Sequence, residues 1–131
     1  MTNTQIVQKL YENFGKRDIP AIIDMLADDA EFHDSASLWI DGKPHVVPFA
    51  GIYKGKESMP GFFAKMGETT EILKFEPVKF FENGNHVIAL INLKGRFITD
   101  GTEGESLWVM LWEIENGKIK SNRVTTMPGT L

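Results

Sequence analysis

Short glycine turns divide the second half of this chain into segments of strand length, and they constrain its fold more than any other feature. Asn83-Gly84 and Asn116-Gly117 are dipeptides that two-residue β-hairpin turns favour, and Asp100-Gly101 marks a third, longer loop. These turns predict strands near residues 72–82, 86–99, 105–115 and 119–127. Strands joined by tight turns pair antiparallel, so we expect one antiparallel sheet.

The first half of the chain has helical rather than strand periodicity. Apolar residues spaced along one helical face predict a first helix over about residues 3–14. Thr2 and Gln5 have the spacing of a capping box, and Gly15 suits the left-handed residue that ends a helix. A second helix is expected after Asp18, a plausible N-cap, with Pro20 in its first turn and an end near residues 27–29.

The middle of the chain alternates between strand and helix signals. A short strand is expected over residues 31–34, then a loop or hairpin over 35–54 with a second short strand near Ile52-Tyr53. Met59, Phe62 and Phe63 predict a third helix over about 56–66, closed by Gly67. Pro77 places the next strand at a sheet edge or at a bulge, because proline lacks a ladder donor. The expected order is ααββαββββ, an α+β fold in which a cone-shaped, curved antiparallel sheet wraps around three helices.

Composition limits the chemistry and the partners that this chain could have. Its 131 residues predict a single domain over residues 1–131. The net charge of −4 argues against nucleic acid as a partner, and no apolar run is long enough for a membrane helix. With no cysteine and no signal peptide pattern, we expect a cytoplasmic protein that uses carboxylates rather than thiols.

The strand predicted over 105–115 is apolar on both faces. Trp108, Met110 and Trp112 share one face, while Val109 and Leu111 share the other. One face is expected to cover helices or a ligand cavity. The other would be a large exposed apolar surface in a monomer, so we expect a homodimer formed through this sheet face.

The order of elements and several segments resemble the nuclear transport factor 2-like superfamily, in particular its SnoaL-like (polyketide cyclase) and ketosteroid isomerase-like branch. The segments that carry the resemblance are Ile6-Val7-Gln8 to Phe14, Asp18-Ile19-Pro20-Ala21-Ile22, Leu26-Ala27-Asp28-Asp29-Ala30-Glu31-Phe32-His33-Asp34, Pro48-Phe49-Ala50-Gly51-Ile52-Tyr53-Lys54-Gly55 and the hairpin from Trp112 to Gly117-Lys118-Ile119. The resemblance covers nearly the whole chain. Because this fold hosts isomerases, cyclases, hydrolases and non-catalytic domains, it implies a fold more strongly than a function.

The resemblance to ketosteroid isomerases implies a catalytic base at Asp34 and no cofactor. The tyrosine and the late-strand acid that hold the developing oxyanion in those enzymes fall on Leu10 and Met110 here. The histidine and acid typical of SnoaL-like cyclases fall near Met110 and Thr126. An epoxide hydrolase arrangement would need Asp34 to meet Arg96 and Asp100.

We therefore expect a cavity that binds a small apolar organic molecule, with Asp34 as general base of an isomerase, cyclase or hydrolase type step. The expected ligand-binding residues are Phe14, Trp39, Phe49, Phe63, Trp108, Met110 and Asn122. No histidine spacing matches a metal motif, and His33 should point away from Asp34. Asn92 either ties strands together or meets a ligand. The alternative function is a non-catalytic ligand-binding or dimerisation module that lacks the acid–base set.

Overall fold

The computed structural model describes residues 1–131 and confirms the α+β class. Its elements are α1 (Asn3–Gly15), α2 (Ile19–Asp24), β1 (Leu26–Asp34), β2 (Ser37–Ile40), β3 (Lys43–Val46), β4 (Gly51–Lys54), the 3-10 turn η1 (Lys56–Ser58), α3 (Met59–Thr69), β5 (Thr70–Asn83), β6 (His86–Phe97), β7 (Glu103–Glu115) and β8 (Lys118–Pro128). No helix combines the length and the apolar character that crossing a membrane requires.

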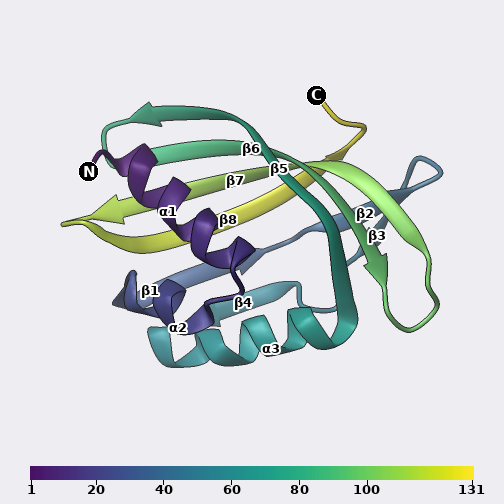
Figure 1. The fold of residues 1–131 in the computed structure, drawn as a ribbon, viewed down its shortest axis with the longest axis horizontal. Coiled ribbons are helices and arrows are strands. Elements are labelled where there is room, and N and C mark those ends of the chain that lie inside the picture. The colour runs from purple at the N-terminus through teal and green to yellow at the C-terminus, as the bar shows by residue number, and fades with distance from the viewer.

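Six strands form one strongly curved, open sheet in the order β4-β1-β8-β7-β6-β5 (Figure 1). The hairpin of β2 and β3 stands apart from this sheet as a separate pair. In Figure 1, α1 crosses in front of β7 and β8, and α3 runs along the lower side of the cone beside α2. The expected cone is confirmed, with one correction. Strands β1 and β8 pair parallel, so the sheet is mixed rather than purely antiparallel.

The helix starts agree with their predicted caps, and the helix ends differ. The capping box of Thr2 and Gln5 is formed, and the Asp18 side chain accepts a hydrogen bond from the Ala21 N–H. Helix α1 does end at Gly15, but Gly15 is not the left-handed residue. The left-handed residue is Arg17, with φ of 57°. Helix α3 continues past Gly67 to Thr69.

The largest difference from the predicted elements lies between α2 and β1. Helix α2 ends at Asp24, and β1 begins at Leu26, where a strand over 31–34 was expected. Ile22, Leu26 and Ala30 are spaced four residues apart, which mimics a helical face. The backbone takes the strand conformation because Leu26 pairs with Ile119 of β8.

The four long strands fall where the turns placed them. Pro77 lies in β5, which is both an edge strand and irregular in register between Pro77 and Lys79, so both expectations for this proline are met. Alternation along β7 sorts its side chains as predicted. Trp108, Trp112 and Ile114 are buried in the core under the helices.

Asn92 serves the chain itself rather than a ligand. Its Nδ2 donates to the carbonyl oxygen of Leu131 at 2.9 Å, and its Oδ1 accepts from the Leu131 N–H at 2.9 Å. Nδ2 also donates to Glu76 of β5 at 3.2 Å. The buried amide therefore ties the C-terminal residue and a neighbouring strand to β6.

Candidate functional site

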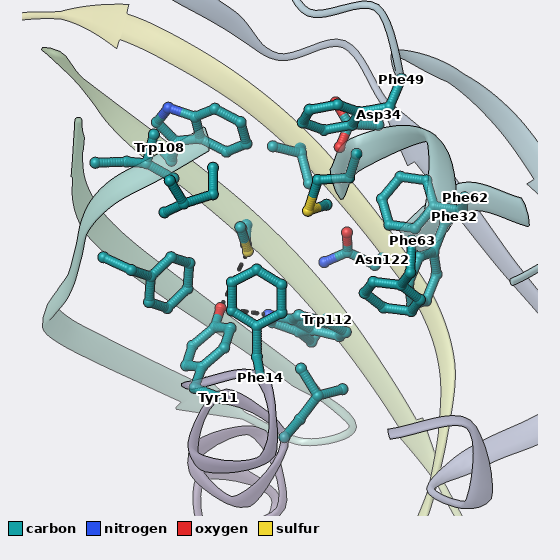
Figure 2. Close-up of a pocket in the computed structure, with 17 residues that line it drawn as sticks. Tyr11, Phe14, Phe32, Asp34, Phe49, Phe62, Phe63, Trp108, Trp112 and Asn122 are labelled. Atoms are coloured by element: carbon teal, nitrogen blue, oxygen red, sulfur yellow. Dashed lines mark hydrogen bonds between the residues drawn. The ribbon is translucent and has the colours of Figure 1, made fainter. Parts of the chain in front are cut away.

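The inner face of the sheet and the helices enclose a small cavity of about 60 Å³ (Figure 2). Of its 17 lining residues, 15 are hydrophobic, so the cavity favours apolar matter. They are Leu10, Tyr11, Phe14, Phe32, Asp34, Phe49, Phe62, Phe63, Met66, Ile72, Phe75, Leu93, Trp108, Met110, Trp112, Asn122 and Val124. Only Asp34 and Asn122 bring a carboxylate and an amide to this lining.

Seven of the eight predicted site residues lie on this cavity. They are Phe14, Asp34, Phe49, Phe63, Trp108, Met110 and Asn122. They come from α1, β1, the loop before β4, α3, β7 and β8, and the curvature of the sheet brings them together.

The placement of Trp39 in the cavity is wrong. Trp39 lies on β2, in the hairpin outside the main sheet, and it does not line the cavity. Its Nε1–H donates to Thr126 Oγ1 at 3.1 Å, so the indole fastens the hairpin to β8. The sequence offered no means to see this, because the strand pair that carries Trp39 leaves the sheet.

Asp34 ends β1 and is 7% exposed. Its Oδ1 accepts a hydrogen bond from the Ala36 N–H at 2.9 Å, and its Oδ2 accepts none from the protein. Burial disfavours the charged carboxylate and raises the pKa of Asp34 to about 6, although the Ala36 N–H acts in the opposite direction. The pKa of Tyr53 is also raised, mainly by burial of its hydroxyl and secondly by the negative charge of Asp34. At neutral pH the cavity therefore contains a carboxylate that readily accepts a proton.

Tyr11 is a lining residue that was not among the predicted site residues. Leu10 and Tyr11 are about 100° apart on the helix, yet both reach the cavity because it extends around α1. The Tyr11 hydroxyl accepts a hydrogen bond from Trp112 Nε1 at 2.8 Å and donates to Met110 Sδ at 3.2 Å. Burial raises the pKa of Tyr11, so this hydroxyl stays protonated. The donor and one acceptor site of this hydroxyl are therefore already used by Met110 and Trp112 of the cavity lining.

Asn122 lies on β8 opposite Trp112 of β7 and Phe32 of β1. Figure 2 shows its side chain pointing into the cavity near Phe63 and Trp112. It is 4% exposed, and its Nδ2 has no hydrogen-bond partner. Buried polar groups are nearly always paired, so this amide is the exception in the site.

The epoxide hydrolase arrangement is not formed. Arg96 is bonded to Glu71 on the edge strand, and Asp100 is exposed in a turn where it accepts from Thr102. His33 points to the other face of the sheet, where its Nε2 lies 3.2 Å from Glu31. The structure brings together no group of three histidine or acidic residues that could hold a metal ion.

The cavity adjoins an open groove of about 820 Å³ between α1, α3 and β5, which we call the entrance groove. Six residues line both spaces: Tyr11, Phe14, Phe63, Met66, Ile72 and Phe75. Phe14 lies between Phe63 and Phe75, with ring centroids 6.5 Å and 5.3 Å away. These rings separate the cavity from the groove, so their rotation would enlarge the space for a ligand.

Comparisons with known proteins agree with this architecture. An NTF2-like protein from Burkholderia xenovorans superposes with a TM-score of 0.80 at 25% identity, covering 95% of this chain and 88% of its own. A candidate SnoaL-like polyketide cyclase from Mesorhizobium loti gives a TM-score of 0.70 at 21% identity, covering 95% and 98%. TerC, crystallised with polyporic acid, gives 0.74 at 18% identity, covering 97% and 92%. A search of curated proteins found no significant match.

The family model that matches the chain is the SnoaL-like domain, over residues 7–122. This match runs from within α1 to Asn122 near the middle of β8, and it includes every residue that lines the cavity except Val124. The fold and the match lead to the same conclusion: the chain belongs to the SnoaL-like family within the nuclear transport factor 2-like superfamily.

Proposed function

We propose that this protein binds a small, mostly apolar organic molecule in the cavity and that Asp34 acts as general base in an isomerase, cyclase or hydrolase type step that uses no cofactor. The observation that carries the proposal is one buried carboxylate, with its pKa raised by burial to about 6, on a wall that is otherwise apolar apart from Asn122. A base works best when its pKa lies near the working pH. Its unpartnered Oδ2 is the oxygen that would accept the proton.

Ligand binding can be tested without knowing the ligand. Native mass spectrometry of the protein after incubation with a metabolite extract should show a bound small molecule. Val124→Phe, which fills the cavity beside Asp34, should lose the adduct while keeping the wild-type circular dichroism spectrum. An adduct that persists in a folded Val124→Phe variant would place the ligand elsewhere.

The role of Asp34 can be tested with acetophenone, a flat carbonyl compound whose methyl hydrogens are weakly acidic. In D₂O, a base breaks a methyl C–H bond, the electron pair moves onto the carbonyl oxygen, and the carbon then takes up a deuteron. We expect the protein to accelerate this exchange, with a rate that rises to a plateau above a pH of about 6. Asp34→Asn should abolish the acceleration while acetophenone still binds.

If the alternative function is right and the protein is a non-catalytic binding module, both wild type and Asp34→Asn should bind acetophenone without accelerating its deuterium exchange. It is favoured by the positions of Leu10 and Met110, where the related isomerases carry oxyanion donors. It is also favoured by the Tyr11 hydroxyl, which Trp112 and Met110 already engage.

We further propose that two copies associate through the outer face of the sheet. One row crosses all six strands on that face: Phe81, Ile88, Leu111, Arg123, His33 and Ile52. Phe81 is 55% exposed and Ile52 is 62% exposed, which leaves apolar side chains in water in a single copy. Sedimentation should give twice the 14.8 kDa chain mass. Leu111→Glu should give the single mass, and Ile98→Glu, away from this row, should not.

A further inference from the structure

Asn122 contains a buried hydrogen-bond donor that the protein does not use. The residue is 4% exposed, and Nδ2 has no partner within the chain. Its neighbours across the strands are Trp112 and Phe32, whose side chains carry no oxygen that could accept from this amide. A buried amide left unpaired opposes folding, so its retention needs a partner supplied from the cavity.

The same amide stands beside the proposed base. In the parallel pair of β1 and β8, Phe32 lies opposite Asn122 and Asp34 lies opposite Val124. Asp34 and Asn122 are therefore diagonal neighbours on one face, with backbones about 7–8 Å apart. Both side chains reach the cavity.

This spacing fits one functional group. A carbonyl oxygen lies about 2.9 Å from an amide donor, and the carbon next to the carbonyl lies about 2.4 Å further on. A base acts on that carbon from about 3–3.5 Å. Laid end to end, these lengths reach about 8–9 Å, so a single carbonyl group is long enough to contact two side chains that reach the cavity from diagonal positions. Atoms on opposite sides of one carbonyl group would thus meet Asn122 and Asp34.

The rest of the lining disfavours anionic ligands and ligands that only donate hydrogen bonds. No lysine, arginine or histidine lines the cavity, so an anionic ligand would meet Asp34 without a counter-ion. The hydroxyl of Tyr11 already accepts from Trp112. A ligand that offers only donors could bond to Asn122 Oδ1 but would leave its Nδ2–H unpaired.

We propose that Asn122 is the specificity-determining residue of the cavity and that its Nδ2–H donates to the carbonyl oxygen of a neutral, mostly apolar ligand. This inference rests on the proposed function, because it assumes that the ligand occupies the cavity beside Asp34. It adds the class of ligand and the atom that recognises it.

The test compares two probes of the same shape. Acetophenone has a carbonyl oxygen where α-methylstyrene has a methylene group, so the two differ in the acceptor. Dissociation constants for both are measured by ¹H–¹⁵N NMR titration of wild type, Asn122→Leu and Asn122→Ala. Asn13→Leu is the matched control. Asn13 is also buried, but its Nδ2 faces Met25 outside the cavity.

We expect Asn122→Leu to reduce the preference for acetophenone over α-methylstyrene by about tenfold. Asn122→Ala should do the same, and Asn13→Leu should leave the preference unchanged. An unchanged preference in both Asn122 variants would overturn the inference, and it would mean that water alone serves the amide. Failure of both probes to bind the wild type would overturn it as well.

The outcomes separate this inference from the proposed function. If wild type and the Asn122 variants show the same preference for acetophenone over α-methylstyrene, Asn122 has no role in recognition. If the same protein binds a metabolite and exchanges deuterium in an Asp34-dependent way, the proposed function is still supported. A shifted preference without exchange would keep Asn122 as the recognition residue and remove Asp34 as the base.

Discussion

Replacing Asp34 with asparagine should stabilise the folded protein at neutral pH, at the expense of its proposed activity. The carboxyl has an ordinary pKa of 3.8, and burial raises it to about 6 in the folded state. That difference corresponds to about 3 kcal/mol between the two protonation states. Asparagine stays neutral and keeps an oxygen that can accept from the Ala36 N–H, so it avoids this cost.

The sign of the effect fixes its pH dependence. Because the pKa of Asp34 is higher in the folded state than in the unfolded state, the protonated carboxyl contributes its full stabilisation below pH 3.8. This stabilisation is lost as the pH rises through about 6. The free energy of unfolding of the wild type should therefore fall relative to Asp34→Asn between about pH 4 and 6. Above that range the variant should be more stable by up to about 3 kcal/mol.

Urea unfolding at a series of pH values from 4 to 8 measures this difference directly. Asp29→Asn is the control, because Lys120 lowers the pKa of that exposed carboxyl and its contribution has the opposite sign. A difference between wild type and Asp34→Asn that stays constant across the series would refute the argument that burial destabilises a charged Asp34.

Two further predictions concern residues that support the fold outside the cavity. Gly104→Ala would place a Cβ 2.8 Å from the backbone oxygen of Trp39, so it should lower the free energy of unfolding by about 1–3 kcal/mol. In Gly67→Ala the new Cβ has open space around it within a helix, so this variant should raise the free energy of unfolding by about 0.5–1 kcal/mol. Thermal or urea unfolding of the pair measures both, and equal effects would contradict the packing argument. Asn92→Leu should release Leu131, so carboxypeptidase should trim the variant faster than wild type. Identical trimming rates would show that these hydrogen bonds do not hold the terminus.

The sequence predicts those parts of the fold that depend on neighbours along the chain. The tight turn at Gly84-Asn85, directly after Asn83, fixes the hairpin of β5 and β6, and the capping box of Thr2 fixes the start of α1. The end of α2 was not predictable in this way. Whether Leu26 continues a helix or begins a strand depends on Ile119, which is remote in sequence.

The candidate site shows the same division. Alternation along a strand predicted a cavity position for Met110 and Asn122, and the resemblance to ketosteroid isomerases predicted the position of Asp34; all three residues line the cavity. Alternation does not reveal that Tyr11 reaches the cavity beside Leu10, because this depends on how far the cavity extends around α1. Nor does a residue pattern show that the Asn122 amide lacks a partner. That fact depends on every atom around it.

The parallel pairing of β1 with β8 sets the order in which the site is assembled. The antiparallel neighbours from β5 to β8 join through short connections, whereas Ser35 bonds to Val124 across 89 residues of sequence. Closing so long a loop is slow compared with forming local hairpins. On the ribosome, Asp34 emerges early but has no neighbour on the β8 side until Asn122 and Val124 have been synthesised. The proposed base and the Asn122 amide therefore come together in a late step of folding, after the aromatic residues that line the cavity are already available to pack.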